Sequence, residues 1–132
     1  MGAYKTKIVN NIICSKVDGE LDASLSYKWI EKLEEQEKGK NLNRFHDVRG
    51  INAVHLSFDD LWAVAQRRME AYESGEETLT AFWVSTPLNY GVASMYQALT
   101  EGTPFEIKVL YKIEDAADFL GVDKKILEDI VY

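Results

Sequence analysis

The most constraining feature of this sequence is the apolar run Leu79–Val84, which ends at the turn residues Ser85-Thr86-Pro87. A short run of this kind, bounded by turn residues, is typical of a strand that is buried on both faces of a sheet. Pro87 then suits the first turn of a helix, where a backbone N–H is not needed. A doubly buried strand followed at once by a helix predicts an α/β architecture.

Segments of helical and strand periodicity alternate along the rest of the chain. Helices are predicted over residues 23–38, 58–72, from 87 to about 101, over 115–120 and from about 123. Strands are predicted over residues 8–17 (as one strand, or as two joined by Asn10-Asn11), 44–48, 79–84 and 105–111. Strands separated by helices of this length favour right-handed crossovers and a parallel sheet.

The predicted fold class is therefore α/β, with a single sheet of 4-5 mostly parallel strands on which helices pack, in the order β-β-α-β-α-β-α-β-α. No Pro-, Gly- or Ser-rich linker divides residues 1–132, so we expect a single domain.

Composition narrows the class of partner. The 22 acidic residues outnumber the 15 basic ones and give a net charge of −7, which disfavours nucleic acid and anionic membranes as partners. A single cysteine, no signal-peptide pattern and no long apolar stretch lead us to expect a soluble cytoplasmic protein without membrane insertion.

The order of elements is similar to that of the STAS (anti-sigma-factor-antagonist-like) domain, and several motifs support the resemblance. Val17–Asp22 looks like the family's "GELD" segment before the first helix, and Phe45–Ile51 resembles its "D-L-x-G-V" strand end. Residues 87–96 and 116–121 resemble the SpoIIAA-like branch of small bacterial proteins, with Phe119 where that branch usually has Trp. The resemblance spans nearly the whole chain.

The resemblance implies a non-enzymatic regulatory or protein-interaction module of STAS-like type. STAS-like folds are related in shape to lipid-transfer (CRAL-TRIO) folds, which implies an alternative function. In that alternative, the protein carries a small apolar or amphipathic ligand in a pocket between sheet and helices.

Ser57 is the candidate phospho-acceptor, because STAS antagonists carry a Ser or Thr at the start of their second helix. This sequence departs from that pattern, since Leu56 replaces an Asp and Phe58-Asp59-Asp60 replaces small residues and glycine. Two carboxylates in the first helical turn would repel a phosphate. The alternative interpretation of Ser57 is a plain N-cap serine.

An interaction surface is predicted around Ser57, Phe58 and Trp62, because Trp62 lies off the apolar stripe of its helix. An exposed tryptophan there would point to an interface with a protein partner or with a second copy in a homodimer.

A second candidate site is an anion or ligand edge at the start of the third helix. Its members are Ser85, Thr86, Asn89 and Tyr90. Ligands of parallel sheets favour the carboxyl ends of the strands, and this helix start is free of acidic residues. The alternative is that Thr86 or Ser85 simply caps the helix.

Catalysis has little support in the sequence. His46, Asp47 and His55 could form an acid–base or metal cluster, but they match no motif of fixed spacing. Cys14 sits in an apolar strand, where a thiol is usually inert. We therefore expect no enzymatic activity, no catalytic residues, no metal site and no cofactor.

Overall fold

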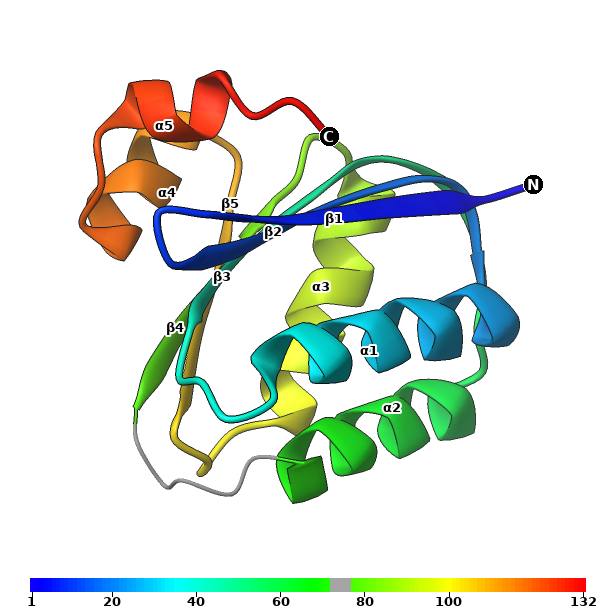
Figure 1. The fold of residues 1–132 in the computed structure, drawn as a ribbon. Coiled ribbons are helices and arrows are strands. Elements are labelled where there is room, and N and C mark those ends of the chain that lie inside the picture. The colour runs from blue at the N-terminus through cyan, green and yellow to red at the C-terminus, as the bar shows by residue number, and fades with distance from the viewer. Residues whose placement is uncertain (72–76) are drawn as a thin grey trace.

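The sheet arranges its strands in the order in which they occur along the chain (Figure 1). The computed structural model describes residues 1–71 and 77–132. The strands are β1 (Ala3–Val9), β2 (Ile12–Asp22), β3 (Asn43–His55), β4 (Thr78–Trp83) and β5 (Phe105–Leu110). The helices are α1 (Ala23–Glu37), α2 (Phe58–Ala71), α3 (Pro87–Leu99), α4 (Ile113–Leu120) and α5 (Lys124–Glu128).

Strand β1 runs antiparallel to β2, and the remaining neighbours pair in parallel. This arrangement confirms the predicted α/β class with a mostly parallel sheet. Tyr72, the last residue of the predicted second helix, lies outside the described residues.

The Asn10-Asn11 turn divides the first predicted strand into a hairpin. Both residues have positive φ, 49° for Asn10 and 60° for Asn11. Two consecutive left-handed residues are the signature of a type I′ turn, whose twist suits a two-residue hairpin, and asparagine tolerates that conformation. Val9 and Ile12 are therefore paired across the hairpin.

Strands β2 and β3 extend further than predicted, to Asp22 and His55. Their distal halves pair with each other beyond the end of β4, and the register shifts twice on the way, near Lys16 and near Gly19. Gly50 leaves room in this region for the side chain of Asp18, because a Cβ at position 50 would lie 1.8 Å from the Asp18 Oδ1 atom. The bulged, partly polar extension does not show the regular alternation from which strands are predicted.

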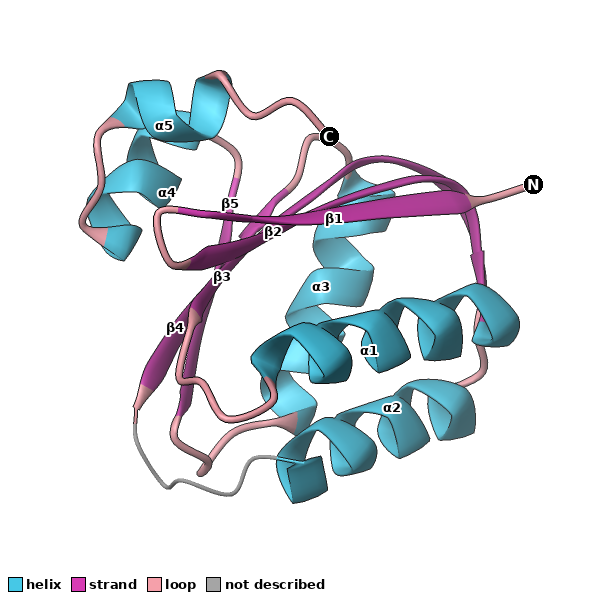
Figure 2. Ribbon diagram, in the orientation of Figure 1, coloured by secondary structure: helices cyan, strands magenta, loops and turns pink. Residues whose placement is uncertain are grey.

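Helices cover both faces of the sheet (Figure 2). On one face, α3 supplies Ala93 to a core that includes Val17, Val48, Phe82 and Ile107. On the other face, α4 and α5 supply Ala116, Ala117, Leu120 and Leu127 to a core with Cys14, Phe45 and Ala81. Leu127, Ile130 and Tyr132 near the C-terminus thus pack on the chain's own core. None of the helices in the described part of the chain is long and apolar enough to span a bilayer.

Helix α3 is rotated relative to the stripe that its sequence suggests. The apolar residues at helical spacing are Leu88, Val92, Met95, Tyr96 and Leu99. Leu88 and Met95 are nevertheless 44% and 47% exposed, whereas Asn89 and Ala93 are buried. The cause is the Asn89 amide, whose Nδ2 donates to the carbonyls of Arg49 and Ile51 in β3. A buried side chain that hydrogen-bonds to the sheet fixes the face that the helix presents.

Candidate functional site

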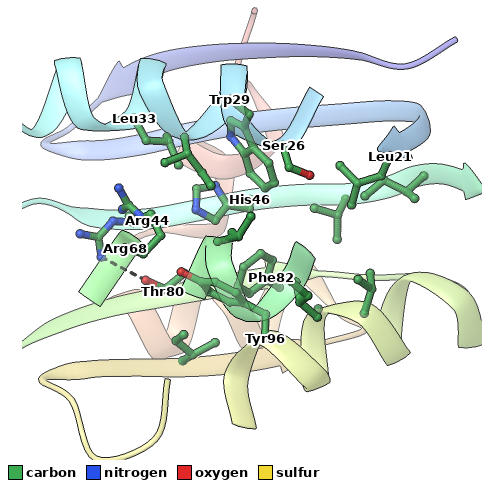
Figure 3. A pocket seen from close by; sticks show the side chains of 18 of the residues that line it. Leu21, Ser26, Trp29, Leu33, Arg44, His46, Arg68, Thr80, Phe82 and Tyr96 are labelled. Carbon is green, nitrogen blue, oxygen red and sulfur yellow. Dashed lines mark hydrogen bonds between the residues drawn. The ribbon is translucent and has the colours of Figure 1, made fainter. Parts of the chain in front are cut away.

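A cavity of about 80 Å³ lies between the sheet and helices α1, α2 and α3. In Figure 3 the side chains that line the cavity extend from the apolar Leu21 at one end to Arg44 and Arg68 at the other, polar end. Much of the remaining lining is aliphatic: Leu21, Ile51, Leu56, Leu61, Val64 and Val92. Helix α2, which packs on α1 and α3, contributes Leu61, Val64 and Arg68 to this lining.

The polar end of the cavity is built around one carboxylate and two guanidinium groups. Arg68 donates to Glu37 from Nη1 at 2.7 Å and from Nη2 at 3.0 Å, and Arg44 Nε donates to the same carboxylate at 2.5 Å. Arg44 Nη1 also donates to the hydroxyls of Thr78 and Thr80, at 3.1 and 3.3 Å. Both arginine side chains are almost fully buried.

Burial alone would raise the pKa of Glu37, but the hydrogen bonds and charges of Arg68 and Arg44 outweigh it and lower that pKa below its usual value. Glu37 is therefore ionised at neutral pH. Of the side chains in the described part of the chain, this cluster then contains two positive charges, from Arg44 and Arg68, and one negative charge, from Glu37.

His46 occupies the middle of the cavity wall and is only 3% exposed. Its ring lies between those of Trp29 and Phe82, with centroid distances of 5.1 and 5.2 Å. Its Nδ1 atom is buried and has no hydrogen-bond partner among the described residues. Burial, and then the positive charges of Arg44 and Arg68, hold the pKa of His46 well below its usual value. The imidazole is therefore neutral at physiological pH.

The start of α2 brings together the three residues of the predicted interaction surface. The Ser57 hydroxyl accepts from the backbone N–H of Asp60 at 3.1 Å, and the Asp60 carboxylate accepts from the Ser57 N–H at 3.0 Å. This reciprocal pair is a capping box with Asp in place of Glu. The side chains of Phe58 and Trp62 are 59% and 49% exposed.

At the start of α3, side chains of the chain itself accept hydrogen bonds from the free backbone N–H groups. The Asn89 Oδ1 atom accepts from the N–H groups of Ser85 and Thr86 at 2.9 and 3.1 Å, and Thr86 Oγ1 accepts from the Asn89 N–H at 3.2 Å. Tyr90 lies outside and stacks on Tyr111 with a centroid distance of 5.4 Å. A ligand at this edge would have to displace these caps or bind beside them.

The three residues of the hypothetical acid–base cluster do not converge. His46 faces the cavity, whereas Asp47, the next residue along β3, faces the other side of the sheet and pairs with Arg49 at 3.0 Å. His55 is exposed at the end of the strand. Within residues 1–71 and 77–132, no group of three or more His, Cys, Asp or Glu side chains could hold a metal ion.

Burial raises the pKa of the Cys14 thiol to about 12, so the group stays protonated. This agrees with the expectation that Cys14 is inert.

The sequence does not predict the cluster of Arg44, Arg68 and Glu37. One signal was present: Arg68 falls within the apolar stripe of its helix, where a charged residue needs a partner. The sequence pattern does not identify that partner, because Glu37 lies 31 positions from Arg68 in the chain.

Comparison with known proteins places this architecture among SpoIIAA-like folds. No protein-family model and no curated protein sequence matched the chain. The chain is similar to the crystal structure of an uncharacterised DUF3478-family protein with a SpoIIAA-like fold from Shewanella loihica PV-4, with a TM-score of 0.59 and 19% identity. The match covers 90% of this chain and 93% of that one. The protein thus has a SpoIIAA-like fold, as its sequence motifs indicated.

Proposed function

We propose that this protein is a non-enzymatic regulatory module that binds a protein partner through the outer face of α2. The observation that carries the proposal is the pair Phe58 and Trp62, which α2 leaves in solvent one turn apart. Residues four apart lie on the same side of a helix and form one continuous apolar surface. Large aromatic side chains of this kind are the usual anchors of protein interfaces.

The charge around this pair indicates the chemistry of the partner. Asp59 lies in the same turn, and the chain as a whole carries a net charge of −7. A complementary surface would offer an apolar recess with lysine or arginine at its rim. Two copies meeting through this face would bring their acidic first turns together, so we favour a different protein over a homodimer.

The test compares Trp62→Ser and Phe58→Ser with Leu88→Ser. Leu88 is a matched control, because it is 44% exposed but lies on α3. Tagged proteins are used to capture partners from a lysate of the native organism, and captured proteins are quantified by mass spectrometry. We expect one dominant partner whose recovery falls at least tenfold in both α2 variants and is unchanged in the control.

Thermal melting shows whether the three variants remain folded, and sedimentation velocity tests the homodimer. A wild-type dimer that Trp62→Ser dissociates would identify the partner as a second copy. Equal recovery with all folded variants would show that the α2 surface is not the interface.

The cavity favours a second candidate function, the carriage of a small apolar or amphipathic ligand. Its apolar end and its polar end match the two parts of such a molecule. Native mass spectrometry of protein purified under mild conditions tests this function directly. We expect an adduct of constant mass that is lost on denaturation, and protein of the bare chain mass only would count against a carrier.

A further inference from the structure

Helix α3 is uncharged on the side that faces solvent as well as on the side that faces the sheet. Its residues, Pro87–Leu99, include no acidic or basic side chain, whereas α1, α2, α4 and α5 all contain acidic residues. The inner side packs on the sheet through Asn89 and Ala93. On the outer side, Leu88 and Met95 are 44% and 47% exposed. A helix that is apolar all round is normally buried all round, so the outer side of α3 has the composition of a covered surface.

Gly91, in the middle of this outer side, supports the same conclusion. Glycine inside a helix is destabilising relative to alanine, because it loses more conformational freedom on folding. The described residues give no reason for a glycine here: the residue is helical, and a Cβ at this position would meet none of their atoms within 4 Å. A helical glycine on an open surface leaves room for the close approach of another molecule.

The exposed apolar surface continues beyond the helix itself. Tyr90, in the same turn as Leu88, is 42% exposed and stacks on Tyr111, which is 52% exposed. Large apolar and aromatic side chains gathered on one side of a molecule mark an interaction surface.

The outer side of α3 alternates large and small side chains in an order that matches its own reverse. Leu88, Gly91, Met95 and Ala98 follow one another at spacings of three, four and three residues, and therefore form one row along the helix. In an antiparallel pair of identical helices that places Met95 opposite Gly91, Leu88 lies opposite Ala98. Each large side chain then meets a small one, as in well-packed helices. The same contacts occur in both directions, as a two-fold axis requires.

Charge favours a second copy of the chain as the molecule that covers α3. Each copy carries a net charge of −7, so two copies repel each other unless they meet at a surface where neither is charged. Helix α3 offers such a surface. A different protein that is complementary to an acidic chain would present basic residues, and α3 has no carboxylate to pair with them.

We infer that two copies of this protein form a two-fold dimer in which α3 packs antiparallel against α3 of the second copy. Leu88 packs on Ala98 and Met95 packs on Gly91, each across the two-fold axis. This interface lies on a different helix from the α2 surface, so the inference goes beyond the partner binding proposed above and leaves that surface free.

The experiment uses the full chain, first as the wild-type protein. Sedimentation velocity over concentrations from about 1 μM to 1 mM measures the dimer, and we expect a reversible monomer–dimer equilibrium. Nuclear Overhauser contacts between the methyl groups of Leu88 and Ala98 then locate the interface. Ten residues span about 15 Å along one helix, so a contact between these methyl groups can arise only between two copies.

Two variants at the interface and one control test the pairing. Gly91→Met places two methionines opposite each other and should weaken the dimer at least tenfold. The double variant Gly91→Met/Met95→Ala exchanges the large and the small residue and should restore the affinity to within about threefold of wild type. Trp62→Ser, on α2, should leave the affinity unchanged.

The stability of the Gly91→Met monomer separates lost pairing from lost folding. Methionine favours helix more than glycine does, and its side chain would enter open space. At a concentration where both proteins are monomeric, we therefore expect the melting temperature of the variant to lie about 2–4 °C above that of wild type. A variant that is more stable and yet fails to dimerise has lost only the interface.

Four outcomes would overturn the inference. A wild-type protein that stays monomeric over the whole series has no α3 dimer, and the α2 proposal would be unaffected. A dimer without the contact between Leu88 and Ala98, or one that the double variant does not restore, pairs in another way. A dimer that Trp62→Ser dissociates pairs through α2. A different protein that is captured from a lysate by the wild type and lost with Gly91→Met would itself be the molecule that covers α3.

Discussion

At the scale of single residues, the most unusual feature is a histidine that the fold keeps uncharged. His46 is packed between two aromatic rings and faces two arginines, so a proton on its ring would be both dehydrated and repelled. In the unfolded chain the same ring is in water and titrates near the ordinary value of about 6.5. Folding therefore competes with protonation.

This competition predicts how stability depends on pH. Between the lowered pKa of folded His46 and the ordinary value near 6.5, the unfolded chain binds one more proton, so stability rises with pH. We expect the free energy of unfolding, measured by urea denaturation, to fall from pH 7 to pH 5 by up to about 1.4 kcal/mol per unit. His46→Phe should flatten this part of the profile.

His55→Gln serves as the matched control, because it removes the other histidine of the chain, which is exposed and lies outside the cavity. Glu37 acts in a separate window: its lowered pKa gives stability that is present above the ordinary glutamate value near 4.3 and lost below it. A wild-type slope that survives in His46→Phe would show that another group is responsible.

At the scale of elements, the hairpin β1–β2 illustrates how two residues set a register. Asn10 and Asn11 both adopt left-handed conformations, and the β1–β2 register follows from this turn. A type I′ turn favours Asn at its first central position and Gly at its second. The sequence thus has the preferred residue at position 10 and a tolerated one at position 11.

Substitutions at position 11 should therefore change stability in opposite directions. Asn11→Gly should stabilise the protein by about 0.5–1 kcal/mol, because glycine adopts positive φ without a steric penalty. Asn11→Val should destabilise it by about 1–2 kcal/mol, since a β-branched residue is strained there. Chemical denaturation of both variants measures the difference, and equal midpoints for the two variants would contradict the turn assignment.

Much of the element pattern could be predicted from sequence, because it depends on local periodicity. The first helix and the strand of residues 79–84 were placed to within about a residue of their observed bounds, Ala23–Glu37 and Thr78–Trp83. The rotation of α3 could not be predicted. It depends on the Asn89 amide reaching two carbonyls of β3, which lie 38 and 40 positions away in the chain.

At the scale of the whole molecule, the overall fold was predictable and the cavity was not. The SpoIIAA-like architecture follows from the order of elements and from motifs of adjacent residues. The polar end of the cavity takes Glu37 from α1, Arg44 from β3, Arg68 from α2, Thr80 from β4 and Tyr96 from α3. Only the packed structure brings together single residues from five elements.

The sequential order β1-β2-β3-β4-β5 has a consequence for synthesis on the ribosome. Each strand pairs with the one made just before it, so the sheet can grow in step with translation. The cover for one of its faces, however, comes from residues 113–132. Cys14, Phe45 and Ala81 consequently stay exposed until residues 113–132 have left the exit tunnel. The nascent chain is therefore vulnerable to aggregation at this face until those residues have been made and have packed on it.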